Sequence, residues 1–279
     1  MQSLKPILIA GPCLAESYEI LDEVAGLLVP MSKELGCQFY FKASFDKANR
    51  SAVHSERGPG LKKAMQWFAD IKAKYECQVI TDIHETAQVE PVAEVCDGLQ
   101  IPAFLCRQTD LLVAAMKTSC FVNVKKGQFM APEAMTHIAR KGAEVDPKGW
   151  NKRFALTERG TTFGYGDLVV DMRGFQAMAK AHCPIILDVT HSTQRPPAGT
   201  AQTSGAQRHT APLLARAATA TGYVDGYFIE THPEPAKAKS DAGAQLNLEQ
   251  AAVLLRSLWP QWEAAREYQA FDQEYFPET

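Results

Sequence analysis

Four side chains of the types that bind transition metals follow short apolar runs spread along the whole chain. They are a thiol, an imidazole and two carboxyl groups, at Cys13, His191, Glu230 and Asp241. One thiolate, one imidazole and two carboxylates form a ligand set that suits Zn or Fe(II), with Mn, Co or Cd as substitutes. Taken singly, each residue has an ordinary explanation as a buried or surface side chain. Only a fold that brings them together makes a metal site.

Cationic side chains form a second feature, concentrated in the segment KASFDKANRS at residues 42–51. Further cations follow later apolar runs, at Lys125, Lys126 and Arg159. Surface charge is the common explanation for such residues, but cations after three separate strands are better explained by phosphate or carboxylate ligands. Asp82 is the acidic group that could orient substrate hydroxyls or carry protons, unless it caps a helix that begins near Glu85.

The elements that must position these residues alternate along the chain. Apolar, β-branched runs that end in polar residues recur at 7–11, 39–44, 78–83, 98–103, 121–126, 153–160, 184–191 and 226–232. Segments with helical periodicity lie between them, for example at 17–35, 59–75 and 211–222. About eight strand–helix repeats in a chain of 279 residues predict an α/β fold, a (β/α)8 TIM barrel, with residues 1–279 as a single domain.

A doubly wound open sheet is the main alternative to a barrel. Two observations count against it. No G-x-G-x-x-G follows the first apolar run, and polar residues lie at the ends of nearly all strands, whereas an open sheet would gather them at one switch point. In a barrel the last strand lies beside the first, so the ends of strands seven, eight and one are neighbours. This closure predicts that Cys13, His191 and Glu230 meet and that Asp241 folds back over them. His232 and His84 remain alternative ligands.

Composition limits the classes of partner. The formal net charge of −3 gives no basic field for nucleic acid or an anionic membrane, and no apolar stretch is long enough for a bilayer span. Seven cysteines without paired short spacings suit reduced thiols in a cytoplasmic protein. Near the end, residues 247–269 read as an amphipathic closing helix that we expect to be interrupted near Pro260.

The motifs KASFDKANRS, TDIHE, LQIPAFLCRQTDL, NVKKGQF, ERGTTFGY, DVTHS and ETHPEP together resemble the 3-deoxy-D-manno-octulosonate 8-phosphate synthase family over nearly the whole chain. The resemblance implies a cytoplasmic, homotetrameric transferase of lipopolysaccharide precursor biosynthesis. Such an enzyme condenses phosphoenolpyruvate with arabinose 5-phosphate and water. The alternative is the sister family, 3-deoxy-D-arabino-heptulosonate 7-phosphate synthase, which acts on erythrose 4-phosphate and typically carries KPRTS where this chain has KANRS.

The resemblance also implies roles for individual residues. Phosphoenolpyruvate would be held by Lys42, Ser44, Lys47, Gln100, Lys125 and Arg159. Arabinose 5-phosphate would be held by Asn49, Arg50, Ser51 and Asp82, with Arg107 reaching its phosphate from a neighbouring subunit. We expect the catalytic residues to be Lys47, Asn49, Asp82 and His191.

Metal dependence is implied by two positions. Metal-independent members of the family carry Asn at the position of Cys13, and Cys-Asp-Gly where this chain has Ser240-Asp241-Ala242. Both differences place the chain with the metal-dependent group. One departure is the loop at 194–199, which is less glycine-rich than is usual in the family, so its closure over substrates is not predicted. A sugar-phosphate sensor and a Schiff-base aldolase stay open as other classes of function.

Overall fold

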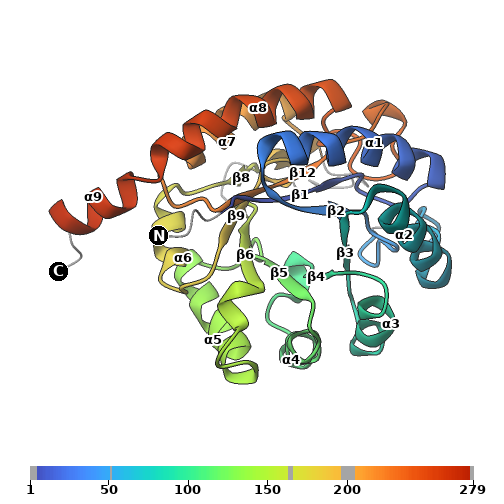
Figure 1. The fold of residues 1–279 in the computed structure, drawn as a ribbon, viewed down its shortest axis with the longest axis horizontal. Helices are drawn as coiled ribbons and strands as arrows, with labels where there is room; N and C mark the ends of the chain where they lie inside the picture. The colour runs from blue at the N-terminus through green and yellow to red at the C-terminus, as the bar shows by residue number, and fades with distance from the viewer. Residues whose placement is uncertain (1–4, 51, 163–165, 196–204, 277–279) are drawn as a thin grey trace.

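A computed structural model describes residues 5–50, 52–162, 166–195 and 205–276. Eight parallel strands close into a barrel in the order β1-β12-β9-β6-β5-β4-β3-β2, so the predicted (β/α)8 fold is confirmed (Figure 1). The barrel strands are β1 (Ile7–Gly11), β2 (Gln38–Lys42), β3 (Gln78–Asp82), β4 (Gly98–Ile101), β5 (Phe121–Lys125), β6 (Phe154–Glu158), β9 (Ile185–Asp188) and β12 (Gly226–Glu230).

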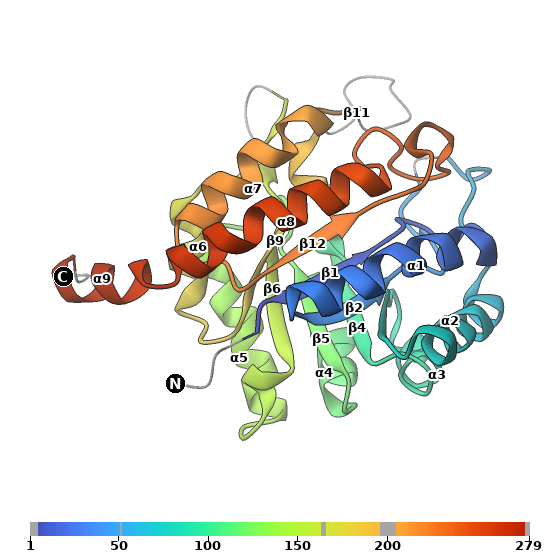
Figure 2. The same ribbon diagram turned by 45° about the horizontal axis from the view of Figure 1, so that its top comes forward.

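Helices surround the barrel, and α7 and α8 lie side by side against it (Figure 2). They are α1 (Tyr18–Leu35), α2 (Leu61–Tyr75), α3 (Val89–Ala93), α4 (Thr109–Lys117), α5 (Met135–Val145), α6 (Arg173–Ala179), α7 (Ala211–Ala220) and α8 (Leu248–Ala265). Short 3-10 helices are η1 (Thr86–Gln88), η2 (Ala103–Leu105), η3 (Pro132–Ala134), η4 (Trp150–Lys152), η5 (His191–Thr193), η6 (Arg208–Thr210) and η7 (Pro235–Lys237). Two small sheets pair β7 (Thr161–Thr162) with β8 (Leu168–Val169) and β10 (Gln194–Arg195) with β11 (Gly205–Ala206).

The inside of the barrel changes from apolar to charged along each strand. A small apolar cluster fills its lower part and includes Tyr40, Phe121 and Phe228. Side chains two residues apart in a strand share a face, so the inward positions that follow these aromatics are polar. In β2 and β12 those positions are Lys42 and Glu230, both buried. The strand pattern therefore builds a layer of buried charges on an apolar base.

Close contact between β1 and β2 depends on glycine at the end of β1. A Cβ atom at Gly11 would lie 2.0 Å from the carbonyl oxygen of Lys42, a distance that no side chain permits. Only glycine lets the two backbones approach this closely. The contact places the chain that carries Cys13 directly beside the end of β2.

The closing helix differs from its prediction. Helix α8 begins with a capping box between Asn247 and Gln250 and continues through Pro260 to Ala265, so the predicted interruption at Pro260 is wrong. Two buried indoles hold the helix across the proline: Trp259 donates to the Leu35 carbonyl at 2.8 Å and Trp262 to the Val224 carbonyl at 2.7 Å. The chain breaks later, before α9 (Tyr268–Tyr275), which extends away from the barrel (Figure 1).

Candidate active site and metal centre

Three of the predicted metal ligands meet where the barrel closes. Ligand atoms of Cys13, Glu230 and Asp241 all lie within 4.8 Å of one another, and Cys13 Sγ donates to Asp241 Oδ2 at 3.2 Å. Glu230 is fully buried, and its Oε2 makes no well-aligned hydrogen bond among the described residues, although His191 Nε2 lies 3.3 Å from it. A buried carboxylate oxygen without a donor is costly unless a cation completes it. The arrangement therefore fits a divalent metal.

His191 turns toward the same place from η5, just after β9. Its Nδ1 lies 2.7 Å from Asp188 Oδ2, while its Nε2 lies 3.3 Å from Glu230 Oε2 and 3.8 Å from Asp241 Oδ2. A carboxylate on one ring nitrogen fixes the orientation and leaves the other nitrogen to face a metal. Asp188 thus supports His191 as a fourth ligand.

The charges of this corner also favour a cation. Burial alone would raise the pKa of Glu230, but the neighbouring His191, Lys42 and Lys47 hold the pKa well below its ordinary value, so the carboxylate is ionised and can bind a cation. Burial raises the pKa of the Cys13 thiol, and the negative charge of Glu230 raises it further. A divalent cation would stabilise both the thiolate and the adjacent carboxylates.

The two alternative histidines lie outside this group. His232 Nδ1 accepts from the Glu234 backbone N–H at 3.0 Å, and its Nε2 lies 3.8 Å from Glu16 Oε1. His84 packs its ring edge-on against Phe45. Among the described residues, neither has a hydrogen bond or ion pair with Cys13, Glu230 or Asp241, whereas His191 Nε2 lies within 3.8 Å of both carboxylates.

Lys42 connects the metal corner with the cationic side of the barrel mouth. Its Nζ donates to Glu230 Oε1 at 2.8 Å and to Ser44 Oγ at 3.0 Å, and lies 3.7 Å from Asp82 Oδ2. Burial alone would lower the pKa of Lys42, but the carboxylates of Glu230 and Asp82 raise the pKa above its ordinary value. Lys47 reaches the same Ser44 hydroxyl at 3.1 Å. Two ammonium groups thus share one wall of the site.

The opposite wall carries Lys125 and Arg159. Lys125 pairs with Asp188 and lies 3.1 Å from the centre of the Phe228 ring, and burial lowers its pKa to about 8 despite the charge of Asp188. Arg159 donates to Gln194 Oε1 at 2.6 Å, while its buried Nη1 has no partner in the described residues. A buried guanidinium with a spare donor is suited to a phosphate or carboxylate.

Asp82 stands in a ladder of polar side chains across neighbouring strands. It accepts hydrogen bonds from Ser44 and from Gln100, the latter at 2.5 Å, and Asn123 donates to Gln100 Oε1 at 2.9 Å. Burial alone would raise the pKa of Asp82, but Lys42 and Lys47 lower the pKa below its ordinary value. Glu85, not Asp82, is the N-cap of η1. Asp82 therefore belongs to the site wall.

The remaining predicted residues lie on the rim. Arg50 donates to the backbone oxygens of Glu56 and Lys239, at 2.8 and 2.9 Å, and Asn49 and Arg107 are exposed. Ser51 and residues 196–199 of the loop after β9 lie outside the described residues. Lys126 does not join Lys125: it points to Thr161 Oγ at 2.9 Å and pairs with Glu158, because consecutive strand residues face opposite ways.

Several supporting residues were missed by sequence reasoning. Gln245 Oε1 accepts from the Cys13 backbone N–H at 3.1 Å, and its Nε2 donates to the Ser240 carbonyl at 2.8 Å. Gln194 donates to Asp241 Oδ1 at 2.7 Å. Only Asp188 had a sequence signal, its place three residues before His191 at the end of an apolar run. The amides carry no comparable signal.

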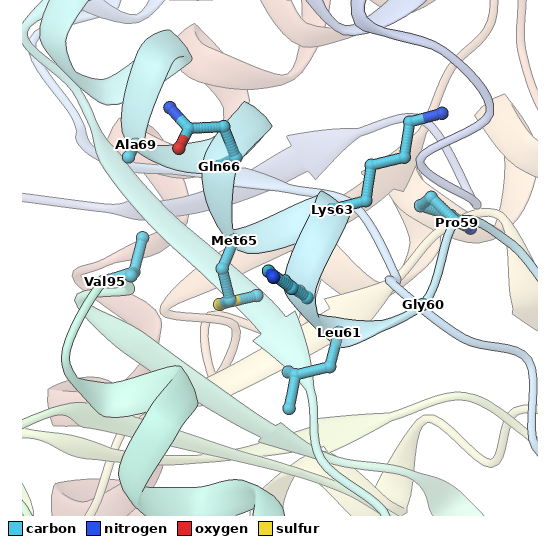
Figure 3. A pocket seen from close by; sticks show the side chains of 9 residues that line it. Pro59, Gly60, Leu61, Lys63, Met65, Gln66, Ala69 and Val95 are labelled. Atoms are coloured by element: carbon cyan, nitrogen blue, oxygen red, sulfur yellow. The ribbon is translucent and has the colours of Figure 1, made fainter.

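An open groove of about 770 Å³ lies away from this site (Figure 3). It is lined by Pro59, Gly60, Leu61, Lys62, Lys63, Met65, Gln66, Ala69 and Val95. None of the predicted site residues lines it. No helix of the described residues is both long and apolar enough to cross a membrane.

Comparison with known proteins adds an independent finding. A model of the family described as the DAHP synthetase I family matches residues 2–267. A relative from Fusobacterium nucleatum is 52% identical over 250 residues, which cover 90% of this chain and 88% of the relative. Relatives from Bordetella bronchiseptica and Wolinella succinogenes are each 49% identical, over 90% of this chain and 88% and 97% of their own lengths. All three are named 2-dehydro-3-deoxyphosphooctonate aldolase.

Proposed function

The chain belongs to the DAHP synthetase I family. From the name that its relatives share, we propose that it condenses phosphoenolpyruvate with arabinose 5-phosphate and water. The products are 3-deoxy-D-manno-octulosonate 8-phosphate, a lipopolysaccharide precursor, and phosphate. The name shared by relatives at 49–52% identity supports this reaction over that of the erythrose 4-phosphate enzymes, which are relatives only at the family level. The observation that carries the proposal is a wall of buried cations beside converging metal-ligand atoms.

Phosphoenolpyruvate fits the buried inner part of the mouth. Lys42 and Lys125 approach from two walls, and Arg159 has a buried donor without a partner. Lys47, Ser44 and Gln100 supply further donors at the same level. Fixed cations in a water-poor site bind a phosphate and a carboxylate strongly, because they need no rearrangement when the ligand enters.

Arabinose 5-phosphate would then lie toward the rim. Asn49, Arg50 and Ser51 are the last residues of the cationic segment at 42–51. Asp82, at the end of β3, has a buried carboxylate that accepts from Ser44 and Gln100. The carboxylate suits hydrogen bonds from sugar hydroxyls. Arg107 would reach the sugar phosphate of a neighbouring subunit in a homotetramer, which agrees with its exposure next to Phe104, itself 57% exposed.

A divalent metal, Zn or Fe(II), would be held by Cys13, His191, Glu230 and Asp241, with Mn, Co or Cd as substitutes. When bound, the metal would supply a positive centre that polarises or orients an oxygen of a substrate or water. The chain itself supports the ligands: Asp188 orients His191, Gln245 holds the Cys13 backbone, and Gln194 contacts Asp241.

In the proposed reaction, C3 of phosphoenolpyruvate attacks the aldehyde while water adds at C2, and the hemiketal phosphate then loses phosphate by carbon–oxygen cleavage. The residues act mainly by placement. Lys42, Lys47, Lys125 and Arg159 would hold phosphoenolpyruvate so that C3 faces the aldehyde. Asn49 and Arg50 would hold the second substrate. Placement of this kind replaces a rare encounter with a nearly unimolecular step. Asp82 is the group suited to proton transfer, whereas His191 would act by holding the metal.

Location and assembly follow from the same membership. We propose a cytoplasmic enzyme, in agreement with seven free cysteines and no disulfide among the described residues. A homotetramer agrees with two exposed aromatic side chains, Phe104 in η2 after β4 and Phe129 in the segment after β5. Size measurement in solution tests the assembly directly.

The proposal is tested by phosphate release from phosphoenolpyruvate with arabinose 5-phosphate or with erythrose 4-phosphate, before and after chelation and metal addition. We expect release with arabinose 5-phosphate that chelation abolishes and metal restores. Preference for erythrose 4-phosphate would reject the proposed aldehyde. Full turnover after complete metal removal would reject the metal role and leave the reaction standing.

A second mechanism, imine formation at a lysine, is favoured by one observation. The pKa of Lys125 falls to about 8 through burial, and a neutral amine is the nucleophile of Schiff-base aldolases. Borohydride added with substrate would trap such an imine as a covalent adduct on Lys125. We expect no adduct, because the ion pair between Lys125 and Asp188 favours the charged form.

A further inference from the structure

Asp241 is the most exposed of the four proposed metal ligands and lies in a loop. Cys13 and Glu230 are fully buried at strand ends, whereas the Asp241 side chain is 25% exposed and lies in a loop. Its φ of 47° is in the left-handed region, which is unfavourable for a residue with a Cβ atom. A bound metal would be most accessible to solvent on the side of Asp241. The stability of the Asp241 loop would therefore control the dissociation rate of the metal.

Arg208 holds this loop from outside. Its Nη2 donates to the carbonyl oxygen of Ala242 and its Nε to the carbonyl oxygen of Gly243 at 3.2 Å. These two residues come directly after Asp241. The planar guanidinium can satisfy two neighbouring carbonyls at once, which a lysine ammonium does with less fixed geometry.

The segment that carries Arg208 is itself fixed to the chain after His191. The Gln207 backbone N–H donates to the Thr193 carbonyl at 2.8 Å, and Ala206 pairs with Gln194 in the β10–β11 sheet. Thr193 lies two residues after His191. Arg208 therefore joins the segment of one metal ligand to the loop of another, although it touches neither ligand side chain.

We propose that Arg208 is a positioning residue that retains the bound metal by holding the Asp241 loop closed. The inference rests on the metal site of the proposed function and adds a residue that controls the rate at which the metal leaves. Outer contacts of metal ligands change metal affinity by roughly 10–100-fold when they are removed. Since Arg208 acts on the most exposed ligand, this effect falls mainly on the dissociation rate.

The test measures Co(II) release from the loaded enzyme into excess EDTA, followed by the loss of the Co(II) absorption bands. Arg208→Ala should release Co(II) about 10–100-fold faster than the unsubstituted protein. Arg208→Lys should fall between the two, and it guards against poor folding of the alanine variant. Arg216→Ala is the matched control. Arg216 and Arg208 both line a second groove, beside α7 and α8, but Arg216 makes no side-chain bond to the Asp241 loop among the described residues, so its removal should leave the rate unchanged.

A double-mutant comparison separates positioning from general packing. In an Asp241→Ala background, Arg208→Ala should add no further acceleration, because the ligand through which it acts is already gone. Equal acceleration in both backgrounds, or unchanged release from Arg208→Ala and Arg208→Lys, would overturn the proposal and leave the proposed function intact. Failure of the unsubstituted protein to bind Co(II) would overturn both the metal site and this inference.

Discussion

The ends of the barrel strands and the rim loop after β2 both carry polar and cationic side chains, but the two regions differ in how far these side chains are buried and in what they bond to. At the strand ends, Lys42 is 1% exposed and Glu230 is 0% exposed, and the two form an ion pair at 2.8 Å. On the rim, Asn49 is exposed, and the partners of Arg50 among the described residues are the backbone oxygens of Glu56 and Lys239. Charges of the first group are held by buried ion pairs before a ligand arrives, whereas Arg50 is held by backbone oxygens alone and Asn49 carries no charge.

The difference teaches how the two proposed substrates are recognised. A buried charge is costly unless it is paired, so each strand-end cation has a partner that also fixes its position. Rim residues stay hydrated and carry no such cost. We therefore expect substitutions at strand ends to change metal content, stability and turnover together, and substitutions on the rim to change only the KM for the sugar phosphate.

The largest effect is expected from Cys13→Ala. Loss of the thiolate leaves His191, Glu230 and Asp241 as the three remaining ligands. We expect less than about a tenth of the protein molecules to hold metal, and turnover to fall by more than about 100-fold. Metal analysis and phosphate release measure the two quantities. Full metal content with normal turnover would contradict the role of the strand ends in metal binding.

The next effect is expected from Lys42→Met. This change leaves Glu230 and Asp82 without their buried cation, and breaking such a pair costs about 3–5 kcal/mol of unfolding free energy. Denaturant unfolding of the metal-free protein measures it, with Lys62→Met on the surface as control. A loss below about 1 kcal/mol would remove the distinction between strand ends and rim.

Arg50→Ala tests the rim itself. Hydrogen bonds to a charged ligand contribute about 1.5–3 kcal/mol, so the KM for arabinose 5-phosphate should rise about 10–100-fold. The KM for phosphoenolpyruvate and the unfolding free energy should hardly change. If stability falls as far as in Lys42→Met, the rim is not the adaptable region that the comparison describes.

The smallest effect is expected from Arg256→Ala, which removes an exposed ion pair with Glu34 at 2.8 Å, far from the site. Both side chains are about half exposed, so the pair contributes less than about 1 kcal/mol. Thermal unfolding and turnover should match the unsubstituted protein closely. This variant measures how much unfolding free energy an exposed ion pair contributes, for comparison with the buried pair of Lys42.

The sequence by itself determined the barrel and the place of its main charges. Eight apolar, β-branched runs that end in polar residues marked the strands, and closure of a parallel barrel brought Cys13, Glu230 and His191 close together. These predictions succeed because strand direction and alternation are local properties that a barrel repeats. The prediction at Pro260 was wrong because distant partners of Trp259 and Trp262 hold the helix together.

Only the tertiary structure decided how the ligands are held. Gln245 reaches Cys13 across 232 positions of the sequence, and Arg208 reaches Ala242 across 34. A polar side chain can bond to any donor or acceptor that packing brings within reach, so no periodicity in the sequence names its partner. Strand ends are specified by local pattern, whereas their supporting contacts exist only after the chain has closed on itself.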